Sequence, residues 1–237
     1  MDYIYDLKIY VNMIRSKYPD TPLLMLGHGL GGTIACRYAL TYQDDLSGLV
    51  FSSPGFIPLL DIPPFKAKCA SFLSSLTPSL QIRFNMDPAD LSHDEAAISS
   101  IVNDSLIHMT ITPRFYTEYM NNAAFCIDHA RQLRIPLLFI HGSDDRFCDP
   151  KGSQIVFDSA ESEDKTAFFF PGLNHDTINE SPKPRTKVLS ALTKWIAAHS
   201  HVRTQRKASP AAPAAGKASL KTSAKSAKGK KVVKKKA

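Results

Sequence analysis

The spacing of apolar residues predicts an amphipathic helix near each end of the first 200 residues. Within 3–18 and within 183–199, apolar side chains recur mostly at intervals of three or four, which places them on one helical face. The residues that carry this pattern are Ile4, Leu7, Val11 and Ile14 in the first segment, and Val188, Leu192, Trp195 and Ile196 in the second. A third helix is expected over 31–42.

Four short apolar runs predict buried strands. They cover 23–26, 49–52, 137–142 and 167–172. Short and almost wholly apolar runs are typical of parallel strands, because such strands are covered on both faces. Since the runs alternate with helical patterns, the sequence predicts an α/β fold with a parallel sheet.

Residues 56–134 interrupt this alternation. They contain several helical stretches and no clear strand. An insertion of that length between two strands of one sheet is typical of a cap or lid. We therefore expect a core in two halves, 1–55 and 135–202, a helical cap over 56–134, and a separate tail over 203–237.

Charge also divides the chain after residue 202. The net charge is +7, yet residues 203–237 hold 12 of the 29 Lys and Arg residues and no acidic residue. The body keeps 17 basic residues against 22 acidic ones, which leaves it near −5. The tail is poor in large apolar residues, so it is predicted to be disordered. It is either a solvated extension or an electrostatic binder of nucleic acid or an anionic membrane surface.

Other features exclude several classes of protein. The cysteines show no CxxC or metal-ligand spacing, so we expect reduced packing residues at Cys36, Cys69, Cys126 and Cys148. No apolar run approaches the ~18 residues of a membrane span, and the N-terminus has no secretory pattern. The sequence therefore predicts a cytoplasmic protein with no metal and no cofactor.

The most informative motif lacks a hydroxyl group. Residues 27–31 read Gly-His-Gly-Leu-Gly directly after the first predicted strand. In the G-x-S-x-G nucleophile elbow, a Ser is exposed on a tight strand-to-helix turn. Here Gly29 occupies the nucleophile position, and glycine can adopt the strained elbow backbone easily. Acyl transfer by such a site needs an activated nucleophile, which this position does not supply.

The elbow is followed by four further stretches that match a known family in the same order. Together these motifs resemble the monoacylglycerol lipase and lysophospholipase branch of the α/β-hydrolases, which is the serine aminopeptidase S33 or hydrolase-4 type. The stretches read NMDPADLSHDE, DSLIHMTITPRFYTEYM, IPLLFIHGSDDRFCDP and FFFPGLNHDTINE. The resemblance implies a partial α/β-hydrolase fold, with about four parallel strands flanked by helices and a helical cap. It also implies a relation to enzymes that hydrolyse carboxylic esters.

The same motifs imply the site residues. Asp145 corresponds to the triad acid, with Asp144 as the less favoured alternative, and His175 corresponds to the general base. The backbone N–H of Leu30 would be one oxyanion donor. His28 is expected to pack with its side chain pointing away from the pocket. The candidate acyl-lining residues in the cap are Phe56, Ile57, Leu59, Leu60 and Phe65.

Two departures leave the function open. No His-Gly pair precedes the elbow to give a second oxyanion donor, and the first four strands of the family's sheet are absent. Strand 23–26 should then lie at a sheet edge, so the chain is either a fragment of a longer product or docks that edge against a partner or second copy. We carry three hypotheses: an impaired ester hydrolase for lipid-like or small acyl substrates, a non-catalytic binding or scaffold protein, and a degenerate product without activity.

Overall fold

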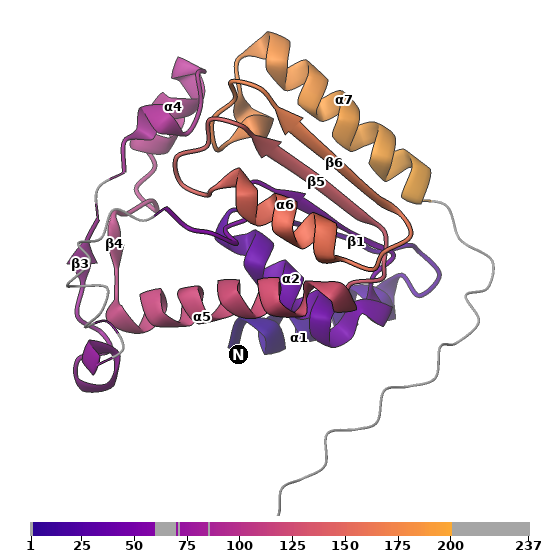
Figure 1. Cartoon of the computed structure of the whole chain (residues 1–237), viewed down its shortest axis with the longest axis horizontal. Coiled ribbons are helices and arrows are strands. Elements are labelled where there is room, and N and C mark those ends of the chain that lie inside the picture. The colour runs from indigo at the N-terminus through magenta and orange to yellow at the C-terminus, as the bar shows by residue number, and fades with distance from the viewer. Residues whose placement is uncertain (1, 60–69, 71, 85, 201–237) are drawn as a thin grey trace, which may run out of the picture. The chain divides into compact units, whose positions relative to one another are not determined.

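The structure is a computed structural model that describes residues 2–59, 70, 72–84 and 86–200 (Figure 1). Its helices include α1 (Asp2–Lys17), α2 (Leu30–Tyr42), α4 (Glu95–Val102), α5 (Pro113–His129), α6 (Pro150–Ser159) and α7 (Pro182–His199). Its strands are β1 (Leu24–His28), β2 (Gly48–Ser52), β3 (Ile82–Arg83), β4 (Thr110–Ile111), β5 (Leu137–Gly142) and β6 (Lys165–Phe170). The chain divides into two units after Val202, where the charge also changes, and all described residues belong to the first unit.

Four parallel strands form the main sheet in the order β1-β2-β5-β6. Leu26 of β1 is paired with Val50 of β2, and Val50 is paired in turn with Leu138 of β5. Every residue of β2 and β5 is buried, as expected of mostly apolar parallel strands that are covered on both faces. The predicted α/β class and the parallel sheet of four strands are confirmed.

Helices cover both faces of this sheet. Alternate residues of the central strands point to opposite faces, so Phe51 and Phe139 pack in a cluster with α1, α2, α5 and α6. Val50, Leu138 and Ile140 pack on the other side against α7. Figure 1 shows α7 on the opposite side of the sheet from α2 and α5. The carboxyl ends of the strands are thereby held at a common edge, where sites of open α/β sheets form.

The segment that we expected to form a wholly helical cap differs in two ways. It contains a short antiparallel pair, β3 with β4, which the sequence pattern did not indicate because each strand has only two residues. In addition, α5 packs on α2: the Cys126 thiol lies 3.4 Å from the carbonyl oxygen of Thr33, and the Arg37 guanidinium lies over the Phe125 ring. The end of the expected cap therefore belongs to the core. The predicted tail, 203–237, lies outside the described residues.

Strand β1 lies at the sheet edge, as predicted. Among the described strands it pairs with β2 alone, and Leu26 is 45% exposed. An apolar strand with an unpaired backbone edge is a template for association. No helix in the described part of the chain is long and apolar enough to cross a membrane.

We therefore expect the purified chain to self-associate in a concentration-dependent manner. Leu26→Lys should reduce this association, because a lysine on an edge strand opposes pairing with another strand. Leu189→Lys, at an exposed leucine of α7, is the matched control and should leave it unchanged. Light scattering after size exclusion measures the effect, and a wild-type chain that stays monomeric at all concentrations would contradict the expectation.

Candidate active site

The turn between β1 and α2 has the backbone of a nucleophile elbow. Gly29 adopts φ 53° and ψ −123°, a conformation that strains residues with a side chain. Its N–H donates to the carbonyl oxygen of Ser52 at 3.0 Å, and its own carbonyl accepts from Gly55 at 2.8 Å. A side chain at Gly27 would collide with the carbonyl oxygen of Gly31. The turn is thus held in shape by glycine and by backbone hydrogen bonds.

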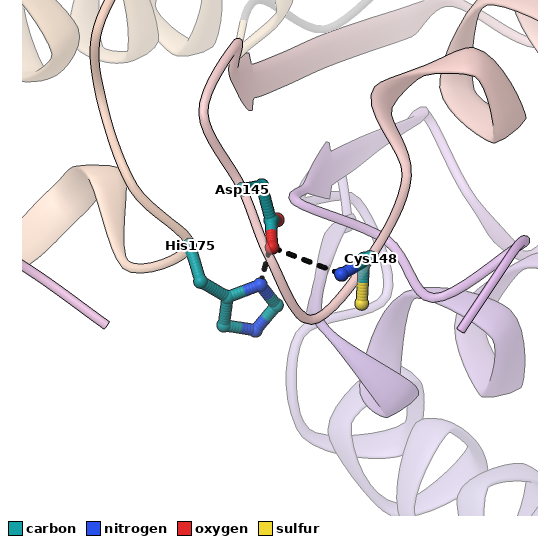
Figure 2. Close-up of side chains that lie close together, drawn as sticks. All are labelled: Asp145, Cys148 and His175. Atoms are coloured by element: carbon teal, nitrogen blue, oxygen red, sulfur yellow. Dashed lines mark hydrogen bonds and ion pairs between the residues drawn. The ribbon is translucent and has the colours of Figure 1, made fainter. Parts of the chain in front are cut away.

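The predicted acid and base meet beside this turn. Asp145 follows β5 and His175 follows β6, and His175 Nδ1 lies 2.7 Å from Asp145 Oδ2 (Figure 2). A Cβ atom added to Gly29 would lie 3.2 Å from His175 Nε2. One side chain at position 29 would therefore bridge to the imidazole. Asp144, the alternative acid, is exposed and accepts a hydrogen bond from Ser143 instead.

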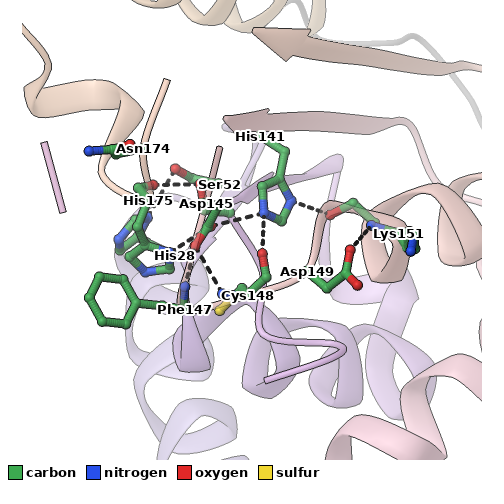
Figure 3. A network of polar contacts seen from close by, with 12 residues as sticks. His28, Ser52, His141, Asp145, Phe147, Cys148, Asp149, Lys151, Asn174 and His175 are labelled. Carbon is green, nitrogen blue, oxygen red and sulfur yellow. Dashed lines mark hydrogen bonds and ion pairs between the residues drawn. The ribbon is translucent and has the colours of Figure 1, made fainter. Parts of the chain in front are cut away.

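Asp145 is held in its charged form. Its Oδ1 atom accepts the N–H groups of Phe147 and Cys148 at 2.8 and 2.9 Å, and His141 Nε2 lies 3.0 Å from Oδ2 (Figure 3). Burial by itself would raise the pKa of Asp145, but the hydrogen bonds from His141 and His175 hold this pKa well below its usual value. A charged carboxylate orients the imidazole with its proton on Nδ1 and leaves Nε2 facing Gly29.

His141 is a second histidine on this carboxylate that sequence reasoning did not assign. Its ring is fully buried, and its Nδ1 atom lies 2.7 Å from the Ser153 hydroxyl of α6. The residue is part of the His-Gly pair that ends β5. That motif was the available signal, but the partner on α6 becomes visible only in the folded chain.

The loop that carries His175 is fastened to the segment before α4. Glu180 is completely buried, and its carboxylate accepts the N–H groups of His93, Asn174 and Ser181. Burial would raise the pKa of Glu180, but these bonds and the His93 ring lower it. Glu180 ends the Asn-Glu pair of the base motif, so its role is to hold the His175 loop in place.

His28 lies against His175 and is not among the residues that line the cavity beside Gly29. Its ring centroid is 4.7 Å from that of His175, and its Nδ1 atom lies 3.1 Å from the Ser52 hydroxyl. Burial, together with the nearby charge of a protonated His175, lowers the pKa of His28 to about 4. His28 is therefore neutral at pH 7. The register of β1 pairs His28 with Ser52 and sets its ring beside the loop after β6.

The lowered pKa of His28 predicts that the free energy of unfolding decreases in acid. The pKa of His28 is about 4 in the folded chain and about 6.5 when unfolded, so between these values the unfolded state binds the extra proton. Stability should consequently fall as the pH is lowered from 6.5 to 4, by on the order of 3 kcal/mol. Urea unfolding at several pH values measures it. His28→Gln should remove most of this slope, whereas His129→Gln, at a histidine of α5, should keep it. Equal slopes in both variants would contradict the assignment.

A cavity of about 320 Å³ opens beside the elbow and the base. Such a volume suits a small organic ligand, and the walls are mostly apolar. Gly29, Leu30 and His175 contribute one side, and Leu30 begins α2, where the first N–H groups have no partner within the helix. The other lining residues are Phe84, Met86, Leu91, His108, Thr110, Ile111, Phe115, Tyr119, Phe147 and Cys148.

Three of the candidate acyl-lining residues lie outside the cavity. Phe56 is 2% exposed and packs on Phe51 in the core, Ile57 packs against Gly152 of α6, and Leu59 is 45% exposed. None of these three lines the cavity, because the chain after β2 runs into the core and alongside the loop after β5. Leu60 and Phe65 lie outside the described residues.

Three possible metal ligands gather at the same place. Asp145, Cys148 and His175 each offer an atom, and these atoms lie within 4.8 Å of one another. Their spacing in the sequence did not indicate such a set. Burial, together with the charge of Asp145, raises the pKa of the Cys148 thiol, so the thiol is protonated at neutral pH. Asp145 and His175 are already hydrogen bonded to each other. The described cysteines Cys36 and Cys126 are free and buried, as expected of packing residues.

A family model and curated relatives relate the chain to the same group of hydrolases. A family model described as serine aminopeptidase, S33 matches residues 1–182. A monoacylglycerol lipase of Mycolicibacterium smegmatis is 28% identical over 200 residues, with 84% of this chain and 70% of that protein covered. A monoglyceride lipase of Rattus norvegicus is 28% identical over 196 residues, with 82% and 64% covered. The chain thus spans about two thirds of the length of these relatives.

Solved structures of monoacylglycerol lipases superimpose on this chain. The crystal structure of a monoacylglycerol lipase from Paleococcus ferrophilus superimposes with a TM-score of 0.75 at 27% identity, covering 83% of this chain and 76% of that one. A soluble variant of monoglyceride lipase from Saccharomyces cerevisiae, in complex with a substrate analog, superimposes with a TM-score of 0.72. Its identity is 24%, with 84% and 68% covered, so it shows the fold alone.

Proposed function

Because the chain belongs to the serine aminopeptidase S33 family of α/β-hydrolases, we propose that it binds an acyl ester in the cavity beside Gly29 and that its serine-type hydrolysis is impaired. The ester class is that of monoacylglycerols or lysophospholipids. Similarity to monoacylglycerol lipases supports this class. The observation that carries the proposal is the juxtaposition of Gly29, His175 and the apolar cavity that both of them line.

The impairment follows from the missing nucleophile. In a family member with serine at the elbow, the hydroxyl would attack the ester carbonyl and His175 would take its proton. In a known protease, removal of the nucleophile lowers kcat by about 2 × 10⁶. His175 is hydrogen bonded to Asp145 and faces position 29, and these contacts support Gly29 as the position that impairs this chemistry.

Binding of a non-hydrolysable glycerol monoether tests the proposed ligand class. Ile111→Trp should weaken binding at least tenfold, because Ile111 lines the cavity and a larger side chain would fill it. Leu106→Trp is the matched control, since Leu106 is 86% exposed and outside the cavity lining. Titration calorimetry measures the affinity. A wild-type chain that binds no such ether would contradict the proposal.

The second candidate function is a non-catalytic scaffold. It is favoured by the glycine at the elbow together with the 12 basic residues of 203–237, which could hold nucleic acid or an anionic membrane surface. A protein partner or second copy at the β1 edge fits the same role. Under this function the ether would bind without any turnover of the corresponding ester. For both candidate functions, we propose that the chain acts in the cytoplasm.

A further inference from the structure

The space that a side chain at Gly29 would occupy is bounded by the imidazole of the base. A Cβ atom added there meets His175 Nε2 at 3.2 Å and His175 Cε1 at 3.6 Å. No other described atom beyond the neighbouring residues lies within 4 Å of it. Here we call this place the elbow slot. It lies on the wall of the cavity in which an ester would bind.

The base that faces the elbow slot is prepared to accept a proton. The bond between His175 Nδ1 and the charged Asp145 leaves the lone pair of Nε2 directed to the slot. His175 is only 8% exposed, and the Glu180 contacts hold its loop. The dyad therefore keeps its geometry although the residue that it would normally activate is absent.

We propose that a small hydroxylic molecule, water or methanol, occupies the elbow slot and attacks a bound ester directly, so that the chain is a slow general-base hydrolase without an acyl-enzyme. This inference rests on the proposed function for its ester. A serine differs from glycine by one carbon and one oxygen atom, and methanol has the same two heavy atoms. The slot thus matches water and methanol, and the extra carbon atoms of a bulkier alcohol would crowd the imidazole that bounds it.

The reaction balances with water as co-reactant. The water oxygen forms a bond to the carbonyl carbon while His175 Nε2 takes one water proton, and the oxyanion forms near the N–H of Leu30. The bond between the carbonyl carbon and the leaving oxygen then breaks, and Nε2 returns the proton to that oxygen. The products are an alcohol and a carboxylic acid. With methanol, the same steps give a methyl ester, and in neither case does a bond form to the chain.

The test uses p-nitrophenyl butyrate and the full chain. We expect a rate above the buffer rate, because His175 would take a proton from the water in the elbow slot as it attacks the ester. Gly29→Ala should lower this rate at least tenfold, because the added methyl group fills the elbow slot. His175→Gln should do the same, and added imidazole should restore part of its rate. His129→Gln, on α5, is the matched control and should keep the wild-type rate.

Two further readouts separate this mechanism from a covalent one. Methanol should yield methyl butyrate, whereas isopropanol should yield at least tenfold less of its ester. Mass spectrometry of the quenched reaction should find no acyl adduct. An adduct, for example on Cys148, or a rate that is equal in wild type, Gly29→Ala and His175→Gln, would overturn the inference. If the glycerol ether binds and no His175-dependent turnover occurs, the inference fails and the proposed ligand class stands. If His175-dependent turnover occurs and the ether does not bind, the inference stands and the proposed ligand class fails.

Discussion

Gly29→Ser is expected to convert an unlabelled chain into one that reacts with a fluorophosphonate probe. The wild type lacks a hydroxyl at the elbow, so it should show no labelling. In the variant, the serine Cβ atom would lie 3.2 Å from His175 Nε2, so the imidazole must move by a few tenths of an ångström, and the hydroxyl then lies within reach of the base. The backbone at position 29 already has the required φ and ψ, so no rearrangement of the turn is needed.

The expected gain in ester turnover is about 10³-fold. Restoring a nucleophile could recover up to about 10⁶, but the sequence before the elbow has no His-Gly pair to supply a second oxyanion donor, and each such donor contributes about 10²–10³. The variant should also be less stable by about 1–3 kcal/mol, because a non-glycine residue at a φ of 53° is strained.

Gly31→Ser is the matched control for this experiment. Gly31 lies two residues further on in α2, and a Cβ atom there meets nothing within 4 Å. The Gly31→Ser substitution adds the same hydroxyl group at a place that does not contact Asp145 or His175, so labelling and turnover should stay at the wild-type level. Labelling of the wild type would mean that a residue other than position 29 is the nucleophile. A folded Gly29→Ser chain that remains unlabelled would show that the dyad does not act on position 29.

Deleting residues 203–237 should abolish binding to polyanions. This segment carries 12 Lys and Arg residues and no acidic residue, whereas the body is near −5. If six to ten phosphates are neutralised, the affinity should fall by about 10³–10⁵ between 50 and 200 mM salt. Fluorescence anisotropy with a DNA duplex and an RNA strand, and sedimentation with phosphatidylserine vesicles, measure the effect and distinguish the partners.

A variant with the tail lysines and arginines replaced by glutamine keeps the length and removes the charge. It should bind no better than the deletion, while the unfolding of the body should be unchanged in both. Equal binding by the truncated body would mean that the tail has no part in it. Binding that survives high salt would mean that the contact is not electrostatic.

Local sequence was enough to predict α1, α2, α7 and the four strands of the main sheet, and the family motifs pointed to Asp145 and His175. Apolar spacing located α1 and α7, and the short apolar runs located the parallel strands, because helix and strand periods are properties of neighbouring residues. The positions of Asp145 and His175 followed from motifs at the ends of β5 and β6. Parallel strands bring such ends to one edge of the sheet, so the meeting of the two residues is built into the topology.

The lining of the cavity could not be predicted in this way. Phe115 and Tyr119 of α5, Ile111 of β4 and Phe147 after β5 meet around Gly29 only because β3 pairs with β4 and α5 packs on α2. Phe56 is as apolar as these residues, yet it faces the core. Apolar character alone does not distinguish a cavity wall from a core position, because both bury the same kind of surface.

The surroundings of the base were likewise a matter of tertiary structure. The sequence by itself determined that position 29 has no hydroxyl group, that an acid and a base follow in the family's order, and that positive charge is concentrated after residue 202. Only the folded chain decided that His28 lies beside His175, that His141 shares the carboxylate of Asp145, and that Glu180 holds the base loop. These contacts join segments far apart in the sequence, and their geometry depends on strand register and helix packing, which no local pattern specifies.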